Sequence, residues 1–398
     1  MPALYSNKFG RLPLLISGGD GCWLQRENES PLFDAISSHN QCNLGHQHPE
    51  LVAAVKTQAD RLLSASPALQ LPVQQRAGSD LCQIATMHSA ILCDSGAEAN
   101  ELAIKLARFQ GRRKKIAVPA ILTFEGSFHG LSLATMSASD YRKAHARYEP
   151  LVKGFVRAPF NDLSRLRQIA EANNNITAVM VESVQIEAGI RFASTEFLHG
   201  LRQICDEFDW LLILDEIQTT AARTGTFFSF QEHGISPDVV TCGEALANGL
   251  PSGACMARDA AADLLHDGAR GTSLGGGLLS SAVISAQCAV IKQDHLSELA
   301  IARGEELLHA LKAAFAGAHY IKDIRGRGLL IAIEMAEPCE AIIPLALNSG
   351  LLIEVYREKV IQLSPPLIMQ PEDQSFLLDS MVNLIKLYAG DDRKTPRH

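Results

Sequence analysis

The chain has 398 residues, of which 47% are hydrophobic and 20% are charged, and its formal net charge at pH 7 is −8. A chain of this length and composition can bury a sizeable core, and it predicts one large and one smaller domain. The negative balance, without any run of basic residues, argues against a nucleic-acid partner, and no apolar run approaches the length that spans a membrane.

The nine cysteines are scattered, form no Cys-x-x-Cys pair and are odd in number. This pattern is typical of reduced thiols in a cytosolic protein rather than of a disulfide framework. The N-terminal string MPALYSNKFGRLPLL lacks a charged region followed by an apolar core and a cleavage site, so it does not resemble a signal peptide. We therefore expect a cytoplasmic protein.

The N-terminal segment ends in two nearby histidines, His46 and His48, before Pro49. No third ligand stands at a spacing suited to a metal ion, so we expect the histidines to act in a turn or a cap and predict no metal site. After Pro49, apolar residues recur at helical spacing over 50–63, which predicts a helix.

A short apolar strand is predicted over 90–93, followed by a turn of small residues and a helix. The start of such a helix presents free backbone N–H groups and a positive dipole end to an anion. Ser95, Gly96 and Ala97 are therefore candidates for a phosphate-binding turn. Since such a turn is also an ordinary helix cap, the motif alone does not decide between the two roles.

Two further predicted strands each end in a polar string. The strand over 121–124 leads to Phe128 and His129, and the strand over 177–181 leads to the string ESVQIEAG. Phe128 either fills the core or offers a flat apolar face to a ring.

The most informative stretch is 211–253. It opens with the apolar run Leu211–Leu214, which is typical of a strand buried on both faces, and continues with DEIQ, which contains Asp215 and Gln218. In open α/β sheets, ligands bind at the carboxyl ends of the strands. We therefore expect Asp215 at a ligand site, the alternative being a helix cap. A second apolar run, 239–242, breaks into the turn GEALANG.

The remaining chain predicts a second, smaller unit. One or two helices are expected over 281–315, then a strand over 329–333, with which strands over 351–355 and 360–363 could pair in a small sheet. The polar tail, 391–398, is expected to be mobile.

Taken in order, the strings SGAEAN, DEIQ, RTG and GEALANG resemble the class III aminotransferases of the ornithine, acetylornithine and ω-amino acid type, which use pyridoxal phosphate on the fold-type-I scaffold. The resemblance implies an α/β fold, with a large domain on a mostly parallel central sheet and a smaller α+β domain. The implied division is an N-terminal segment contributing to the small domain, a large cofactor-binding domain, a C-terminal small domain and a tail, at residues 1–50, 51–290, 291–390 and 391–398.

The same resemblance implies roles for individual residues. Asp215 would hold the pyridine nitrogen of the cofactor protonated, which makes the ring an electron sink, and Gln218 would lie by the ring hydroxyl. The implied cofactor-binding set is Ser95, Gly96, Ala97, Phe128, which stacks on the ring, His129, Asp215, Gln218 and Ser273, the last from the neighbouring subunit. A shared site implies a homodimer, acting on a small molecule with an amino group or binding a phosphate ligand.

Several positions depart from the family pattern. In the family, the position of Glu244 is the lysine that forms a Schiff base with the cofactor; a carboxylate cannot condense with an aldehyde, although it can act as an acid or a base. At Gln362 the family commonly has an arginine that forks onto the substrate carboxylate and pairs with the acid at Glu187. Leu131 replaces an arginine, and Ile186 replaces a glycine, which predicts a narrower cavity.

These departures leave three hypotheses. The first is an enzyme that binds pyridoxal or pyridoxamine phosphate noncovalently, with Glu244 as general base. The second is a catalytically inactive homologue that serves as a binding protein or as the partner of an active relative in a heteromer. The third is an ordinary transaminase with an engineered substitution at Glu244, and the departures at Leu131, Ile186 and Gln362 count against it. Asp94, where the family more often has asparagine, adds negative charge beside the phosphate turn.

Overall fold

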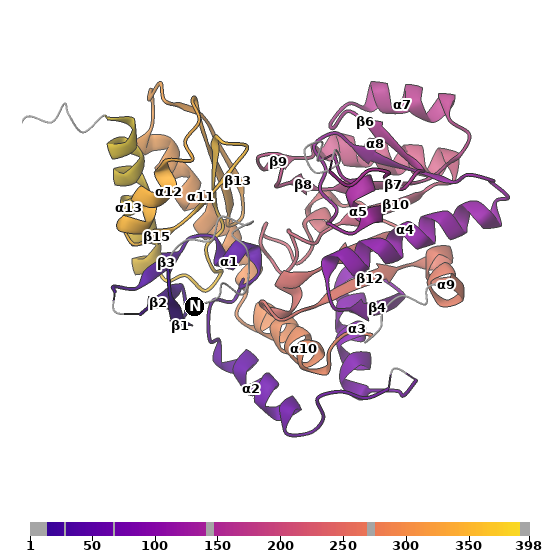
Figure 1. Cartoon of the computed structure of the whole chain (residues 1–398), viewed down its shortest axis with the longest axis horizontal. Helices are drawn as coiled ribbons and strands as arrows, with labels where there is room; N and C mark the ends of the chain where they lie inside the picture. Colours follow the sequence, from indigo (N-terminus) through magenta and orange to yellow (C-terminus); the bar gives the residue numbers. More distant parts are fainter. Residues whose placement is uncertain (1–13, 28, 67, 141–146, 269–274, 391–398) are drawn as a thin grey trace, which may run out of the picture.

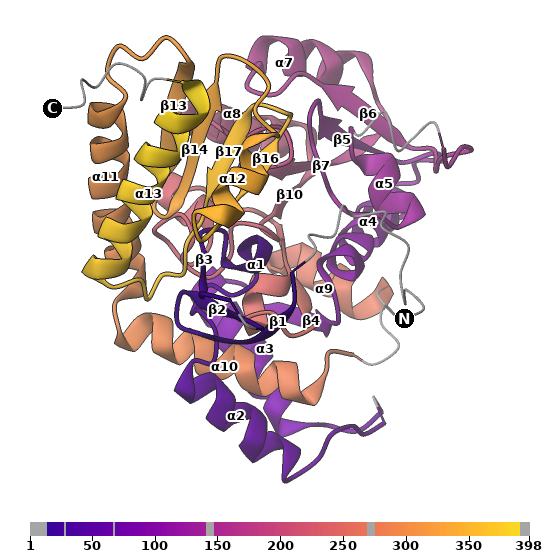
Figure 2. The ribbon, with the colours of Figure 1, turned by 60° about the vertical axis from the view of Figure 1, so that its left-hand side comes forward.

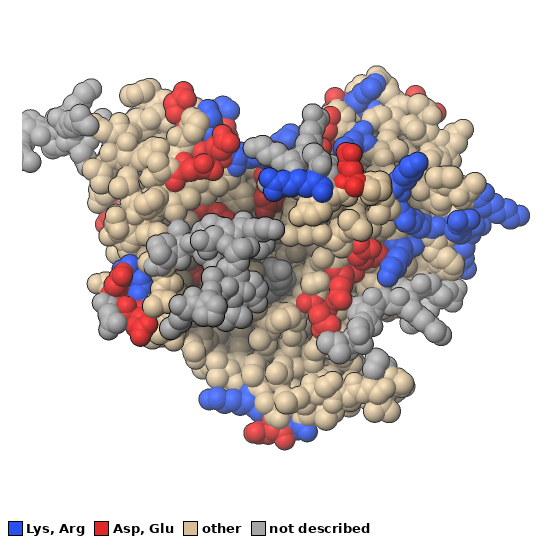
Figure 3. All heavy atoms as spheres, in the orientation of Figure 1, with Lys and Arg blue, Asp and Glu red and all other residues tan. Residues whose placement is uncertain are grey.

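The computed structural model of the chain describes residues 14–27, 29–66, 68–140, 147–268 and 275–390. Figure 1 shows two lobes: one combines the indigo N-terminal strands with the yellow C-terminal helices, and the other holds most of the purple and magenta chain. In the space-filling view of Figure 3, the surface is hollowed between these lobes.

The larger lobe is built on a seven-stranded sheet in the order β4-β12-β11-β10-β7-β5-β6. Its strands are β4 (Ser89–Cys93), β5 (Ala120–Phe124), β6 (Phe155–Ala158), β7 (Ile176–Glu182), β10 (Leu211–Asp215), β11 (Val239–Cys242) and β12 (Gly253–Ala257). β12 is antiparallel to both of its neighbours. The other neighbouring pairs are parallel. This mostly parallel sheet confirms the predicted α/β fold class.

The sheet forms a middle layer because its strands are apolar at consecutive positions. Every residue of β7 and of β10 is buried. Leu212 and Leu214 join one apolar cluster, whereas Ile213 joins a second, as the alternation of side chains along a strand requires. The predicted burial of this strand on both faces is therefore confirmed.

Helices cover both faces of the sheet. Those of the larger lobe are α2 (Pro49–Ala59), α3 (Pro72–Ala85), α4 (Gly96–Arg113), α5 (Leu133–Ala138), α7 (Leu163–Ala172), α8 (Thr195–Phe208), α9 (Asp259–Gly268) and α10 (Leu278–Gln293). The cluster around Ile213 contains residues of α4 and α9, and the cluster around Leu212 contains residues of α7 and α8. α2, α3 and α10 pack together at the lower end of the lobe (Figure 1).

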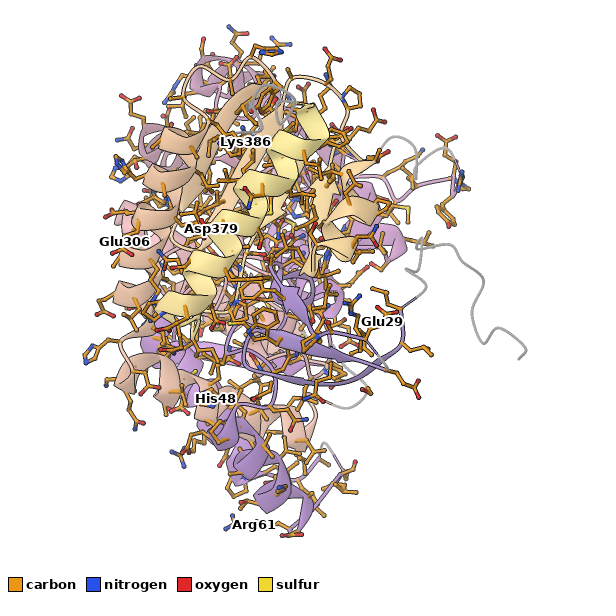
Figure 4. All side chains as sticks on the ribbon, turned by 90° about the vertical axis from the view of Figure 1, so that its left-hand side faces the viewer. Glu29, His48, Arg61, Glu306, Asp379 and Lys386 are labelled. Carbon is orange, nitrogen blue, oxygen red and sulfur yellow. The ribbon has the colours of Figure 1, made fainter. Side chains whose placement is uncertain are left out.

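The smaller lobe has an antiparallel sheet in the order β13-β14-β17-β16. Its elements are β13 (Ile321–Arg327), β14 (Leu330–Met335), β16 (Glu354–Tyr356), β17 (Val360–Leu363), α11 (Leu296–Ala314), α12 (Ile342–Asn348) and α13 (Pro371–Ala389). Figure 4 shows α11 and α13 side by side on the outer face, with Glu306 on α11 and both Asp379 and Lys386 on α13. Gln374 Nε2 donates to Glu306 Oε2 (3.1 Å) between them.

The N-terminal strands join this lobe through a third sheet, β1-β2-β3-β15. It contains β1 (Ile16–Asp20), β2 (Trp23–Arg26), β3 (Leu32–Asp34) and β15 (Leu351–Leu352); Figure 2 shows the first three below the C-terminal strands. The prediction of one strand over 351–355 was thus wrong. Leu351 and Leu352 pair in parallel with β3, and only the residues from Glu354 pair with β17, because the chain changes partner at Ile353.

A left-handed helical turn, α1 (Ser37–Asn40), connects β3 to the larger lobe. All four of its residues have positive φ, from 46° to 67°. Such a conformation is costly for residues with a Cβ, so its surroundings must hold it. Ser37 Oγ donates to the backbone oxygen of Ser364 (2.7 Å), and Ser38 Oγ donates to Asp34 Oδ2 (2.9 Å).

The fully buried Arg223 also holds this turn. Its guanidinium donates to Ser37 Oγ (3.1 Å) and Asn43 Oδ1 (2.6 Å), and to the backbone oxygens of Leu329 (2.9 Å) and Pro365 (2.6 Å). Burial lowers the pKa of Arg223 to about 9, so the side chain remains charged at neutral pH. One side chain thereby joins the N-terminal turn to two segments of the smaller lobe.

All nine cysteines are free thiols. No helix in the described ranges combines the length and the apolar character needed to cross a bilayer. Within the same ranges, no group of His, Cys, Asp and Glu side chains is arranged to hold a metal ion. The tail, 391–398, lies outside the described residues, so its predicted mobility stays a prediction.

Candidate active site

A cavity of about 310 Å³ lies at the carboxyl ends of β7 and β10 and at the N-terminus of α4. Its lining residues are His39, Asn40, Gln41, Ser95, Gly96, Ala97, Phe128, His129, Gly130, Leu131, Glu182, Val184, Asp215, Ile217, Gln218, Thr219 and Ala245. Every predicted cofactor-binding residue in the described part of the chain is among them. The remaining one, Ser273, lies outside the described residues.

Asp215 ends β10 and is only 5% exposed. Its Oδ2 accepts hydrogen bonds from Asn100 Nδ2 (2.7 Å) and His129 Nδ1 (2.7 Å), and its Oδ1 accepts one from the Ile217 N–H (3.1 Å). Thr241 Oγ1 donates to Asn100 Oδ1 (2.6 Å), which fixes the Asn100 amide. A carboxylate has about four lone-pair sites, so this network orients Asp215 and leaves room for one more donor.

His129 and Gln218 each carry an unpaired buried atom beside this carboxylate. His129 Nδ1 is a donor, because it faces the carboxylate of Asp215. His129 Nε2 and Gln218 Oε1 are both buried and have no hydrogen-bond partner within the described part of the chain. Buried polar atoms of this kind are uncommon in folded proteins and mark places where a ligand or water completes the bonding.

The start of α4 forms the opposite end of the cavity. Ser95 is the N-cap of the helix, and its Oγ accepts from the Glu98 N–H (3.2 Å). A Cβ added to Gly96 would lie 2.8 Å from the side chain of Ile217, so only glycine fits there. The turn therefore serves as a cap, and it also brings the first N–H groups of α4 to the cavity wall.

Asp94 is the acid expected to weaken a phosphate site at this turn. Its Oδ1 accepts from the Gly277 N–H (3.0 Å), and Asp94 does not line the cavity. Burial, followed by the nearby charge of Glu98, raises the pKa of Asp94. The Asp94 carboxyl group is therefore hydrogen-bonded to a loop outside the cavity.

Glu182 and Phe128 form one wall. Glu182 ends β7 beside Asp215, and its Oε2 accepts from the Phe128 N–H (3.0 Å). Burial raises the pKa of Glu182 well above its ordinary value, and the Asp215 charge adds to the effect. This arrangement favours a neutral carboxyl at Glu182 and fixes the backbone that carries the Phe128 ring.

The neighbouring acid, Glu216, has a structural role. It is fully buried and accepts from Ser183 Oγ (3.2 Å) and from the N–H groups of Ser229 (2.9 Å) and Phe230 (2.9 Å). Burial raises its pKa to about 7. Because consecutive strand residues point to opposite sides, only Asp215 of the acid pair reaches the cavity.

Three residues predicted on the substrate side lie off the cavity wall. Gln362 is fully buried and donates through Nε2 to Asn40 Oδ1 (3.0 Å), so Asn40 stands at the wall in its place. Glu187 is partly buried; burial raises its pKa and the charge of His39 lowers it. Ile186 packs in an apolar cluster of the smaller lobe's sheet, so the prediction that it narrows the cavity was wrong.

Glu244 begins the short helix η2 (Glu244–Ala247), directly after β11 and Gly243. Its side chain lies outside what the structure describes. The next residue, Ala245, lines the cavity, so residue 244 directly precedes a residue of the cavity wall.

Sequence reasoning missed two groups of residues. His39, Asn40 and Gln41 line the cavity from the N-terminal segment, and no local pattern indicates a left-handed turn in a stretch without glycine. Asn100 and Thr241 orient the Asp215 carboxylate. The signal for Asn100 was a polar residue on the apolar face of a predicted helix.

Comparisons with known proteins agree with this geometry. The family described as "Aminotransferase class-III" matches residues 4–385. The chain is 39% identical to acetylornithine aminotransferase 1 of Bordetella pertussis, over 99% of this chain and 100% of that protein. It is 37% identical to the acetylornithine aminotransferase of Nitrosomonas europaea, over 95% and 96% of the two chains.

Solved structures give the same result. An ornithine aminotransferase from Toxoplasma gondii, with pyridoxal phosphate at partial occupancy in its active site, superposes with a TM-score of 0.92 at 27% identity and covers 97% of this chain and 93% of its own. The N-acetylornithine aminotransferase of Stenotrophomonas maltophilia superposes with a TM-score of 0.85 at 27% identity, over 97% and 99% of the two chains. The chain therefore belongs to the class III aminotransferases, a family that uses pyridoxal phosphate on the fold-type-I scaffold.

Proposed function

We propose that this chain binds pyridoxal or pyridoxamine 5′-phosphate noncovalently and carries out lysine-independent acid–base chemistry on a small substrate with an amino group, using Glu244 as the acid or base. The observation that supports this most directly is the oriented carboxylate of Asp215, which faces the same cavity as the free N–H groups that begin α4. A pyridine ring with a phosphate on a short arm has the two polar ends that these groups complement.

The cavity fits the cofactor on independent grounds. Asp215 has capacity for one more donor, as a protonated ring nitrogen would be, and the buried Gln218 Oε1 lacks a partner among the described residues. The N–H groups of Gly96 and Ala97 suit a phosphate, and Phe128 offers a ring face. When bound, the cofactor supplies an electron sink, which Asp215 supports by keeping the ring nitrogen protonated.

The noncovalent part of the proposal follows from the chemistry at position 244. A carboxylate lacks the nucleophilic amine needed to attach an aldehyde. Among the described residues that line the cavity there is no lysine to replace it. A carboxyl group can still accept or give up a proton, and Glu244 directly precedes Ala245, which lines the cavity.

Absorbance titration tests the proposal. Purified protein is titrated with pyridoxal phosphate and pyridoxamine phosphate, dialysed, and separately treated with borohydride before peptide mass spectrometry. We expect saturable binding that dialysis reverses, with no reduced adduct at a cavity residue. Absence of binding by either form would remove the proposed function, and a stoichiometric lysine adduct would remove its noncovalent part.

The Glu244→Lys variant separates a retained pocket from a remodelled one. If the cavity still fits the cofactor, lysine at this position is expected to give the absorbance band of a lysine–cofactor Schiff base, and borohydride should fix the adduct at residue 244. Glu244→Gln is the matched control and should bind the cofactor reversibly without that band. Failure of the lysine variant to form the band would favour a remodelled cavity.

The alternative is a catalytically inactive homologue that binds a phosphate ligand or serves as the partner of an active relative, and the departures at Glu244, Leu131 and Gln362 favour it. Proton exchange distinguishes the two. If the chain is an enzyme, the α-hydrogen of a substrate amine is expected to exchange with deuterium from D₂O in the presence of pyridoxal phosphate, as measured by NMR. Glu244→Gln is then expected to slow the exchange. Binding without exchange across a panel of amines would favour the alternative.

We further propose a homodimer in the cytoplasm. Three exposed leucines, Leu62, Leu63 and Leu69, follow the end of α2 and offer apolar surface for a second copy. Light scattering is expected to report twice the mass of one chain, and a monomer at micromolar concentration would contradict the proposal.

A further inference from the structure

The left-handed turn α1 carries an unpaired donor on a residue that lines the cavity. Asn40 lines the cavity and is only 3% exposed. Its Oδ1 accepts from Gln362, whereas its Nδ2 is buried without a hydrogen-bond partner in the described ranges. A buried N–H without an acceptor is unfavourable, so a bound molecule that supplies an acceptor here gains more than the same molecule gains at an exposed amide.

Gln362 determines which end of the Asn40 amide remains unpaired. Gln362 is fully buried, and its Nε2 donates to Ser364 Oγ (2.8 Å) as well as to Asn40 Oδ1 (3.0 Å). In this arrangement Gln362 Nε2 faces the Asn40 oxygen, because an amide nitrogen can only donate, and Gln362 Oε1 has no hydrogen-bond partner among the described residues. The nitrogen of Asn40 is therefore the end that remains for a ligand.

The charge of the cavity decides what kind of acceptor fits. Among the described lining residues there is no Lys or Arg, and the two lining histidines, His39 and His129, already contact the carboxylates of Glu354 (2.8 Å) and Asp215 (2.7 Å). Leu131, which is 61% exposed, occupies the wall with an apolar side chain. A carboxylate that entered this site would find no unpaired, positively charged side chain and would lose its hydration. A neutral carbonyl oxygen needs only the one donor that Asn40 offers.

We infer that the cavity selects an amine whose second polar group is a neutral carbonyl acceptor, such as a carboxamide, in preference to a carboxylate. Asn40 Nδ2 donates to that carbonyl, and Gln362 is a positioning residue that orients Asn40. This inference rests on the proposed function, since the amine is the substrate of the cofactor site.

Isothermal titration of the protein loaded with pyridoxamine phosphate tests the inference. The probes are β-alaninamide and β-alanine, which differ only in a carboxamide against a carboxylate, and the amine cofactor does not condense with either. We expect the amide to bind about tenfold tighter or more. Equal affinities, or tighter binding of β-alanine, overturn the inference and leave the proposed function standing. Failure of pyridoxamine phosphate to bind, read from its absorbance before any probe is added, overturns both.

Two variants of the turn assign the donor. Asn40 has φ of 63°, which glycine adopts without strain, so Asn40→Gly removes the amide with little backbone penalty. We expect the affinity for β-alaninamide to fall about tenfold, while the affinities for β-alanine and for the cofactor stay unchanged. Ser38→Gly is the matched control, because Ser38 belongs to the same turn (φ 49°) but does not line the cavity. The assignment of Asn40 as the donor is overturned if Asn40→Gly still binds β-alaninamide more tightly than β-alanine. It is also overturned if Ser38→Gly loses as much affinity for β-alaninamide as Asn40→Gly does.

Gln362→Met tests the positioning role, since methionine matches the volume but cannot donate. The ratio of amide to carboxylate affinity is expected to fall while cofactor affinity is kept, and an unchanged ratio overturns the role. Leu131→Arg adds a cation at an exposed position, where folding is not at risk. It is expected to raise the affinity for β-alanine about tenfold, and an unchanged affinity contradicts the account of the cavity's charge.

Discussion

At the scale of single residues, the site depends on how Asp215 is held. Its Oδ2 is shared by Asn100 and His129, and Thr241 fixes Asn100 in turn. Each side chain in this series of hydrogen bonds has one orientation that satisfies its neighbours. The Asp215 carboxylate is therefore fixed before any ligand binds. A preorganised charge of this kind needs little rearrangement on binding.

Asp215→Asn is expected to weaken binding of pyridoxamine phosphate by about tenfold or more, because asparagine keeps the shape but removes the charge that stabilises a protonated ring nitrogen. Fluorescence titration of the cofactor measures the effect. Asp206→Asn, an exposed carboxylate on α8, is the control and should leave the affinity unchanged. Wild-type affinity in Asp215→Asn would show that the ring nitrogen does not face this residue.

At the scale of elements, the left-handed turn α1 is the least expected part of the cavity wall. Four consecutive residues with positive φ cost backbone energy, and the hydrogen bonds from Arg223 and Ser37 offset that cost. The turn brings Asn40 to the wall, so the substrate side of the cavity depends on a side chain, Arg223, that does not line it.

Arg223→Met is therefore expected to lower the free energy of unfolding by about 3 kcal/mol, because it leaves buried acceptors on Asn43, Leu329 and Pro365 without their donor. Urea denaturation followed by circular dichroism measures the change. Arg165→Met, at an exposed position on α7, is the control and should change the free energy of unfolding by less than about 0.5 kcal/mol. A similar loss in both variants would mean that the buried hydrogen bonds of Arg223 contribute little.

Five of the seven strands of the larger lobe's sheet were predicted because their apolar runs are local, whereas β6 and β12 were not predicted. Val239–Cys242 has the predicted bounds, and the run at Leu211–Leu214 extends by one residue to Asp215. The pairing of Leu351 with Phe33 could not be predicted. Strand partners that are far apart in the chain are chosen by tertiary packing, which leaves no periodic signal in either segment.

For the candidate site, the predicted residues from the ends of the strands and from the turn before α4 do meet in one cavity. They could be predicted because the carboxyl ends of parallel strands lie at one edge of a sheet. Asn40 could not be, because its position depends on a turn held from outside by Arg223. The position of Gln362 could not be predicted either, because its side chain contacts Asn40 and does not itself line the cavity.

At the scale of the whole molecule, a partly buried histidine, His46, and a buried one, His233, make stability depend on pH in opposite directions. The hydrogen bond from His46 to Asp34 (2.9 Å) is the main cause that raises the pKa of His46 to about 9. Burial, followed by the charge of Arg327, lowers the pKa of His233 to about 4. An unfolded histidine has a pKa of about 6.5.

We expect the contribution of these two histidines to the free energy of unfolding to decrease on both sides of about pH 6.5. As pH rises from 6.5 through 9, His46 loses its proton and with it about 2 kcal/mol of stability. As pH falls from 6.5 through 4, the unfolded chain binds a proton that folded His233 does not. Urea midpoints between pH 5 and 9.5 measure both limbs. His46→Gln should flatten the alkaline limb alone, and an unchanged alkaline limb would contradict this assignment.

The antiparallel strand β12 has a consequence for the order in which the chain folds. β4, which leads directly into α4, has β12 as its neighbour in the sheet, and β12 comes about 160 residues later in the chain. During synthesis, the edge that carries Ser95 cannot be completed until residues 253–257 have left the ribosome. Closing so long a loop costs entropy before the contact is made, so the phosphate end of the cavity is expected to be among the last parts to form on refolding.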